Sequence, residues 1–167
     1  MYEPYNPEPL HRRSIRLRDY NYAEAGFYFI TLCTRDKRPI FGHIQNCTMH
    51  LNNLGKFVEK EWLKTPHIRC NIAMHEYVVM PNHIHAIVEI TFCRNTNAAC
   101  AMLSPAKTLG AVVRGFKSAV SGKAGFSVWQ RNYYEHIIRD LHDYGRICDY
   151  IASNPEKWED DVLFVTR

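Results

Sequence analysis

Apolar and polar positions along the chain repeat with two periods, one typical of strands and one typical of helices. Residues 26–34 are rich in aromatic and β-branched side chains and predict a buried strand. Residues 54–62 carry apolar side chains at helical spacing, directly after Asn52-Asn53, which offers a helix cap. This first helix is expected to end by Pro66, because proline disfavours continuation of a helix.

The middle of the chain predicts further strands. A short strand is expected at 47–51, and strongly apolar stretches predict longer strands at 72–80 and 83–92. Only Pro81-Asn82 separates the two longer strands. Such a short turn implies an antiparallel hairpin.

The C-terminal part predicts a helix, an extended stretch at 128–138 and a last helix at 141–153, which Asn154-Pro155 stops. The first of these helices is capped by Thr108, and one of its faces is apolar: Leu109, Val112, Val113, Phe116 and Val120. The overall order is strand, helix, strand, strand, helix, strand, helix. It predicts a ferredoxin-like or RRM-like α+β fold, an antiparallel sheet packed with helices, plus a C-terminal helix.

Length and composition suit one globular domain over 1–167, with a basic N-terminal arm at 1–20 and a flexible loop at 94–106. The chain has no apolar run long enough to span a membrane and no targeting segment, so a cytoplasmic protein is expected. The net charge of +4 favours a polyanionic partner only slightly. The arm concentrates this charge in four arginines that could contact phosphates or belong to a solvated tail: Arg12, Arg13, Arg16 and Arg18.

The six cysteines show no CxxC spacing, which argues against a zinc ribbon. Cys33, Cys47 and Cys148 lie within apolar patterns. We expect reduced thiols in the core.

His83 and His85 are the first candidates for chemistry. Residues two apart on a strand share a face, so the two imidazoles could converge on one metal ion. The spacing alone is a weak signal in a chain with 9 histidines. The position just after a tight turn, on a buried strand, strengthens it. Structural histidines are the alternative.

Tyr150 and Asn154 form a second candidate pair, four residues apart on the predicted last helix and therefore on one face. A phenol can act as a nucleophile, and an amide oxygen can bind a hard metal ion. A core tyrosine and a helix-ending asparagine are the alternative. Between the two pairs, residues 129–139 alternate aromatic and basic side chains, which suits either base stacking and phosphate contact or an amphipathic strand.

Taken in order, these segments resemble the REP-associated tyrosine transposases, a branch of the single-tyrosine HUH transposases. The matching segments cover most of the chain: His11-Arg12-Arg13-Ser14-Ile15-Arg16, Tyr28-Phe29-Ile30-Thr31, Met80-Pro81-Asn82-His83-Ile84-His85, Val128-Trp129-Gln130-Arg131, Tyr134-Glu135-His136-Ile137-Ile138-Arg139 and Tyr150-Ile151-Ala152-Ser153-Asn154-Pro155.

The resemblance implies a metal-dependent enzyme that cleaves and rejoins single-stranded DNA through a 5′-phosphotyrosine intermediate. It implies Tyr150 as the nucleophile, His83 and His85 as metal ligands, and Mg²⁺ or Mn²⁺ as the ion. Asn154 stands where related transposases have a longer glutamine, and it would be the third ligand. The implied substrate is a hairpin of palindromic repeat DNA, which the protein would bind at the bacterial nucleoid. Both a monomer and a homodimer are compatible with the resemblance.

Candidate DNA contacts are the cationic and aromatic residues of the arm, the second long helix and the aromatic–basic segment: Arg12, Arg13, Arg16, Arg18, Arg114, Lys117, Arg131, Tyr134, His136 and Arg139. Two alternatives to the enzyme stay open. One is a non-catalytic RRM-like nucleic-acid binder that uses exposed aromatics such as Tyr28 or Tyr77. The other is a regulator derived from a transposase.

Overall fold

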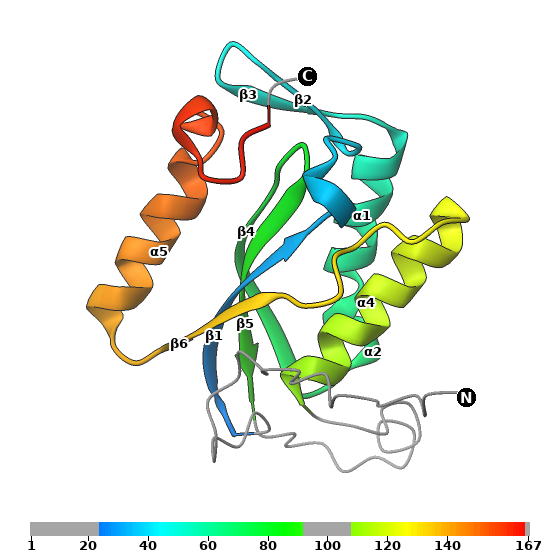
Figure 1. Ribbon diagram of the computed structural model, residues 1–167. Helices are drawn as coiled ribbons and strands as arrows, with labels where there is room; N and C mark the ends of the chain where they lie inside the picture. The colour runs from blue at the N-terminus through cyan, green and yellow to red at the C-terminus, as the bar shows by residue number, and fades with distance from the viewer. Residues whose placement is uncertain (1–23, 92–107, 166–167) are drawn as a thin grey trace, which may run out of the picture.

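The computed structural model describes residues 24–91 and 108–165, and its centre is a four-stranded antiparallel sheet in the order β4-β5-β1-β6 (Figure 1). The predicted basic arm at 1–20 and the loop at 94–106 lie outside the described residues. The strands of this sheet are β1 (Gly26–Cys33), β4 (Ile72–Val79), β5 (His83–Ile90) and β6 (Tyr134–Ile138). The helices and smaller elements are η1 (Arg35–Lys37), β2 (Gly42–Gln45), β3 (Thr48–Leu51), α1 (Asn53–Leu63), α2 (Thr65–Ile68), α4 (Leu109–Ala124), α5 (Leu141–Ser153) and η2 (Trp158–Asp160).

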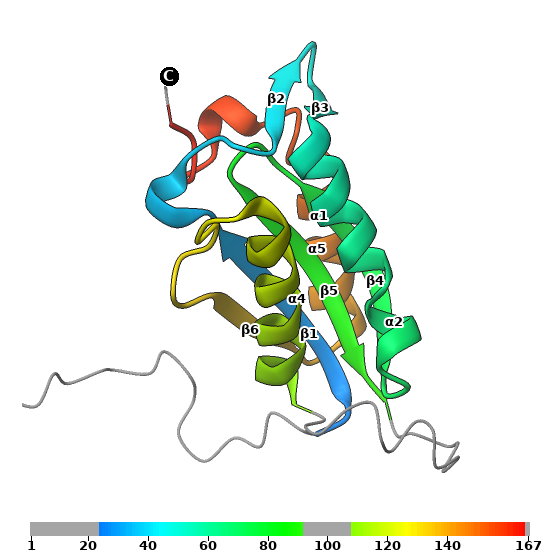
Figure 2. The same ribbon diagram turned by 90° about the vertical axis from the view of Figure 1, so that its right-hand side faces the viewer.

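The two faces of the sheet are covered by different helices: α1 and α4 lie on one face and α5 lies on the other (Figures 1 and 2). Alternate side chains of β1 therefore point to opposite faces of the sheet. Tyr28, Ile30 and Leu32 join a large buried cluster with side chains of α1 and α4. Phe29 packs on the other face, in a smaller cluster with Ile147 of α5. This arrangement confirms the predicted ferredoxin-like α+β fold.

The predicted helix caps are present. The Asn52 carboxamide oxygen accepts a hydrogen bond from the Gly55 amide at 2.9 Å, and the Thr108 hydroxyl accepts one from the Ala111 amide at 3.3 Å. Each satisfies a backbone N–H that has no partner inside its helix. The predicted starts of α1 and α4 are therefore confirmed.

The predicted extended stretch at 128–138 is shorter in the structure, where the strand begins only at Tyr134. Before the strand, the Lys117 ammonium donates to the carbonyls of Gln130 at 2.8 Å and Asn132 at 3.1 Å. These bonds hold the segment against α4. Trp129 keeps one isolated bridge, to Thr34.

The expectation of reduced core thiols at Cys33, Cys47 and Cys148 is wrong at Cys47. Cys47 is exposed, because it lies with Asn46 in the turn between β2 and β3, where both residues have positive φ. Cys70 is disulfide-bonded. Cys33 and Cys148 are free and half-buried. Among the described residues, no helix has both the length and the apolar character needed to cross a membrane.

Two helical glycines give a matched test of the packing of α1. A Cβ added at Gly55 would lie 2.2 Å from the Phe41 carbonyl oxygen, whereas one added at Gly122 of α4 would meet nothing within 4 Å. We expect Gly55→Ala to lower the free energy of unfolding by about 2 kcal/mol through overpacking. Gly122→Ala should raise it by about 0.5–1 kcal/mol through helix propensity. Denaturant unfolding measures both, and equal effects of the two changes would contradict the described packing.

Candidate active site

His83 and His85 lie side by side on β5, on the sheet face covered by α5. Their ring centroids are 4.4 Å apart, and the two residues are 0% and 3% exposed. Ile84, between them, points to the opposite face and joins the α1–α4 core. The structure therefore brings the two imidazoles together on one face, where both can reach a common ligand.

The neighbouring Asn82 fixes the tautomer of His83. The Asn82 side-chain NH₂ donates to the carbonyls of Lys37 at 3.0 Å and Leu163 at 2.8 Å, which turns its oxygen toward His83. That oxygen lies 2.8 Å from His83 Nδ1 and so accepts its proton. His83 Nε2 is left as a buried lone pair without a hydrogen-bond partner. Burial lowers the pKa of His83 to about 3, so the ring is neutral, as a metal ligand must be.

His85 has a comparable arrangement. Its Nδ1 lies 2.8 Å from the Thr31 hydroxyl, and its Nε2 lies 3.1 Å from the Tyr150 hydroxyl. A proton on Nδ1 that is donated to Thr31 leaves Nε2 as an acceptor toward Tyr150. Burial again lowers the pKa of this imidazole well below its usual value.

Tyr150 and Asn154 both reach this site from the end of α5, as their four-residue spacing predicts. Tyr150 is 41% exposed, whereas Asn154 is 2% exposed. The Asn154 NH₂ group donates to Asp161 at 3.0 Å, while its carbonyl oxygen is buried without a partner. The site therefore contains two buried polar atoms without a hydrogen bond of normal geometry, Asn154 Oδ1 and His83 Nε2, and the Asn154 side chain lies close enough to His83 to influence its pKa. Unsatisfied groups of this kind are costly in a core unless a ligand uses them.

Asp161 is a further member of the site that the sequence analysis missed. It follows η2, and one oxygen accepts the Leu163 amide at 2.6 Å. The other oxygen lies 3.5 Å from the Tyr150 hydroxyl. Potential ligand atoms of His83, His85 and Asp161 all lie within 4.8 Å of one another. The acidic run Glu159-Asp160-Asp161 was the available signal, but only the folded chain selects Asp161 from it.

The donor set fits a divalent metal ion. Two neutral imidazoles from β5 and the Asp161 carboxylate after η2 converge, and the buried amide oxygen belongs to Asn154, whose NH₂ group donates to the same carboxylate. Mixed nitrogen and oxygen donors of this type suit several divalent ions. The described residues therefore include a group that could hold a metal.

The environment of Tyr150 disfavours its phenolate. Burial first, and then the negative charge of Asp161, raise the pKa of Tyr150 to about 12. At neutral pH the phenol is protonated. A reaction at this oxygen therefore needs a proton acceptor or a nearby positive charge.

The candidate DNA contacts fall in different places. Tyr134 and His136 of β6 line a pocket beside Tyr150. Arg114 is exposed on α4, across the sheet from Tyr150. Arg131 and Arg139 are also exposed, one before and one after β6 in the sequence. Lys117 holds the 130–132 carbonyls, and burial lowers its pKa to about 8. Four of the candidates lie outside the described residues: Arg12, Arg13, Arg16 and Arg18.

The two aromatics suggested for an RRM-like binder, Tyr28 and Tyr77, are not exposed on the sheet. Tyr28 is fully buried, and its hydroxyl donates to the Glu24 carbonyl at 2.9 Å. Tyr77 is partly buried against the α1–α4 core, and its hydroxyl donates to Glu59 at 3.3 Å. The expectation that either could serve as a stacking platform is wrong, because both rings pack toward the helices.

Comparisons with known proteins relate the chain to two Haemophilus influenzae proteins. No protein-family model matches the chain. A Haemophilus influenzae protein, named only as an uncharacterized protein, is 46% identical over 175 residues, covering 96% of this chain and 97% of that protein. A second H. influenzae protein, assigned by its name to the REP-associated tyrosine transposases, is 24% identical and covers 82% of this chain and 74% of that protein.

A solved structure has the same fold. It is a REP-associated tyrosine transposase bound to a REP hairpin, and it matches with a TM-score of 0.64 at 24% identity, covering 86% of this chain and 73% of that one. The sheet topology and the likeness to this structure define an α+β domain with the tyrosine-transposase fold. The chain belongs to the same family as the 46%-identical H. influenzae protein, and it is a relative of the REP-associated tyrosine transposases. The resemblance drawn from the sequence is thereby confirmed.

Proposed function

We propose that this protein cleaves and rejoins single-stranded DNA, with Tyr150 as the attacking group. The observation that carries the proposal is the position of the Tyr150 hydroxyl, 3.1 Å from His85 Nε2 and 3.5 Å from Asp161, at the edge of the His83–His85 site. A half-exposed nucleophile beside a buried donor set suits a substrate that is brought to the surface of the site.

His83, His85 and Asn154, together with the Asp161 carboxylate, would hold the divalent ion, for which we propose Mg²⁺ or Mn²⁺. When bound, such an ion would polarise a non-bridging oxygen of the scissile phosphate and offset its charge. The protein side of this arrangement is preorganised, because Asn82 and Thr31 orient the two imidazoles through their Nδ1 atoms.

In the proposed reaction, the Tyr150 oxygen forms a bond to phosphorus, and the bond from phosphorus to the 3′-oxygen breaks. The product is a 5′-phosphotyrosine linkage and a free 3′-hydroxyl, which takes up a proton. Asp161 is the nearest carboxylate to the phenol and would accept its proton. A 3′-hydroxyl from another DNA end can reverse the step, so strands are exchanged without an external energy source.

The proposed substrate is DNA that is unpaired at the cut, because a duplex would not present one strand to a small site. The relative of known structure binds a REP hairpin. A labelled single-stranded hairpin oligonucleotide, incubated with Mg²⁺ or Mn²⁺, should therefore give a protein–DNA adduct that survives denaturant. Failure to form an adduct with either ion would contradict the proposal.

Asp161 provides a specific test of the proposed proton and ligand roles. Asp161→Asn should reduce the rate of adduct formation by about tenfold or more, because it removes a charge from the donor set and the carboxylate proposed to accept the phenol's proton. Asp160→Asn is the matched control, since Asp160 is exposed and one residue away. Equal rates for the two variants in a single-turnover gel assay would rule out these roles.

A further inference from the structure

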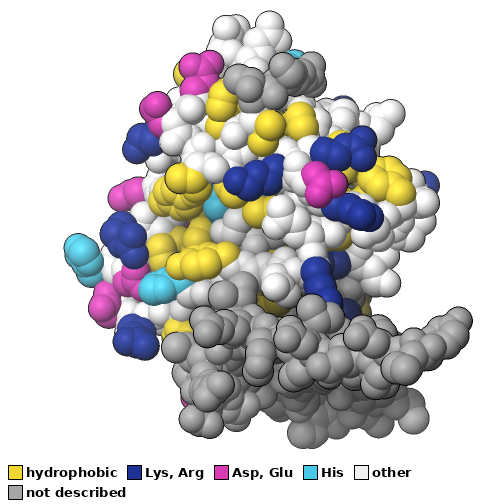
Figure 3. Space-filling view, viewed as in Figure 1, with side chains coloured by type: hydrophobic (Ala, Val, Ile, Leu, Met, Phe, Trp, Pro, Cys, Tyr) yellow, Lys and Arg dark blue, Asp and Glu magenta, His cyan; other side chains and the backbone are white. Residues whose placement is uncertain are grey.

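A pocket of about 480 Å³ opens beside Tyr150, between β6 and α5. Figure 3 shows hydrophobic side chains gathered on this face, with histidine side chains among them and Lys or Arg side chains close by. Phe29, Tyr134 and Ile147 supply apolar surface, and His136 and Arg146 supply polar groups. Its volume and its mixed apolar and polar lining are in the range of small-molecule binding sites.

Among the aromatic rings that line the pocket, the ring of Tyr134 is exposed enough to stack on a ligand. Phe29 contacts both Tyr134 and Tyr150 edge-on, with centroids 6.3 Å and 6.1 Å apart. Tyr134 is 56% exposed on β6, although it is a large aromatic side chain. Exposed aromatics beside a basic group are the usual stacking platforms for unpaired bases.

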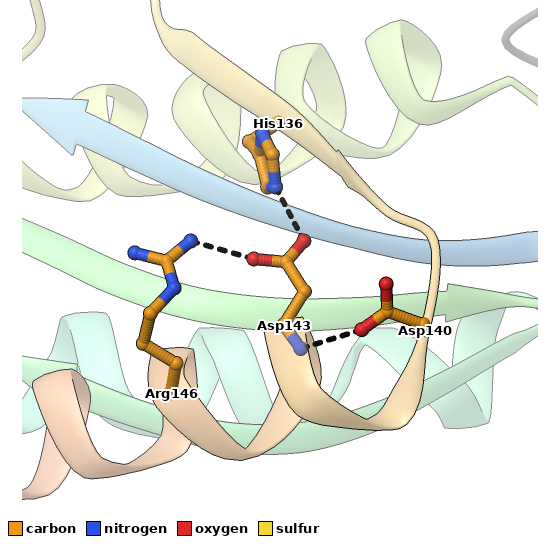
Figure 4. Close-up of polar contacts among 4 residues, drawn as sticks. All are labelled: His136, Asp140, Asp143 and Arg146. Carbon is orange, nitrogen blue, oxygen red and sulfur yellow. Dashed lines mark hydrogen bonds and ion pairs between the residues drawn. The ribbon is translucent and has the colours of Figure 1, made fainter.

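The polar side of the pocket is organised by Asp143, in the first turn of α5 (Figure 4). One Asp143 oxygen accepts from His136 Nε2 at 2.6 Å, and the other accepts from the Arg146 guanidinium at 2.6 Å. The Asp143 amide donates to Asp140 at 2.8 Å, which fixes the start of the helix. The hydrogen bonds from His136 and Arg146 hold the pKa of the Asp143 carboxyl group below its usual value. Asp143 therefore positions two potential phosphate contacts at the pocket.

Arg146 is well placed to follow the DNA backbone. It lies four residues before Tyr150 on α5, so the two side chains share one helix face. Its side chain is 65% exposed, so the donors not bonded to Asp143 can reach a ligand. A phosphate next to the one attacked by Tyr150 would lie within this region.

We propose that this pocket binds the base of one unpaired nucleotide next to the cut, with Tyr134 stacking on the base and Arg146 contacting a neighbouring phosphate. The inference rests on the proposed function, because Tyr150 defines where the cut would be. It assigns a position-specific contact to DNA outside the hairpin stem. Arg146 and Asp143 were not among the residues expected from the sequence.

The test measures binding of the full-length protein to a fluorescent hairpin that carries a single-stranded extension, by anisotropy and without added metal. Abasic substitutions are placed at each extension position in turn. One position should weaken binding to the wild-type protein by about tenfold. Tyr134→Ala should remove that position's effect, and Tyr134→Phe, which keeps the ring, should retain it. The proposal would be overturned if the losses of binding from the abasic substitution and from Tyr134→Ala simply added. It would also be overturned if abasic substitutions weakened binding equally at every position.

The charge contribution is tested separately. Arg146→Gln should weaken binding of the intact hairpin and lower the slope of its salt dependence by about one unit. Lys56→Gln is the control, because Lys56 is an exposed cation on α1, across the sheet. An equal effect of the two variants would overturn the Arg146 contact. These binding measurements need no cleavage. If binding is position-specific but no adduct forms, only the proposed chemistry is rejected. Adduct formation without position-specific binding would reject only the pocket.

Discussion

Tyr150→Phe should abolish the covalent protein–DNA adduct while leaving the fold and hairpin binding intact. The change removes only one oxygen, the atom that would bond to phosphorus, and keeps the ring that contacts Phe29 and His85. The lost hydrogen bonds to His85 and Asp161 involve a half-exposed side chain, so their contribution to stability is modest. Adduct formation is measured on a denaturing gel with a labelled hairpin oligonucleotide.

Two other tyrosines serve as controls for this result. Tyr144 belongs to α5 as well, but its hydroxyl bonds to Glu76 and His75 rather than to the site. Tyr133 lies beside Lys117, with the ammonium 5.7 Å from the ring centroid. Tyr144→Phe and Tyr133→Phe should both form adducts. An adduct that persists in Tyr150→Phe would show that another group attacks.

Replacing both His83 and His85 with alanine should eliminate cleavage but leave hairpin binding within a few fold of the wild type. Both imidazoles present Nε2 to the site, so their loss removes half of the proposed donor set. Stability should change as well, because each ring is buried. Cleavage is measured with Mn²⁺ and Mg²⁺, and metal binding by calorimetry on the same samples.

Conditions that remove the metal should reproduce the effect in the wild-type protein. EDTA should stop adduct formation, and added Mg²⁺ or Mn²⁺ should restore it in the wild type but not in the double variant. His50→Ala is the control, because the ring of His50 stacks on His43 in the β2–β3 hairpin and is not one of the proposed ligands. Cleavage by the wild type in EDTA would contradict the ligand assignment.

Much of this site could be predicted from local sequence patterns. The alternation along β5 places His83 and His85 on one face of that strand. Helical spacing places Tyr150 and Asn154 on one face of α5. Asn52 and Thr108 mark helix starts through hydrogen bonds to nearby amides. These features depend on neighbours within a few residues, which is why the sequence alone reveals them.

Features that depend on distant contacts could not be predicted. Asp161 enters the site because its carboxylate lies close to the ligand atoms of His83 and His85, which are far away in the sequence. It cannot be distinguished in sequence from the acidic residues beside it. The segment before β6 is bonded to Lys117, which belongs to α4. Arg146 and Asp143 gain a possible role only because β6 passes close to the first turns of α5, as the contact with His136 shows (Figure 4).

The most direct test of the central proposal is to identify the protein atom that carries the DNA. The wild-type adduct, formed with Mg²⁺ or Mn²⁺ on a single-stranded hairpin, would be digested with protease and nuclease and analysed by tandem mass spectrometry. We predict a nucleotide joined through its 5′-phosphate to the peptide that contains Tyr150. A nucleotide attached to any other residue, or joined through its 3′-phosphate, would contradict the proposed function.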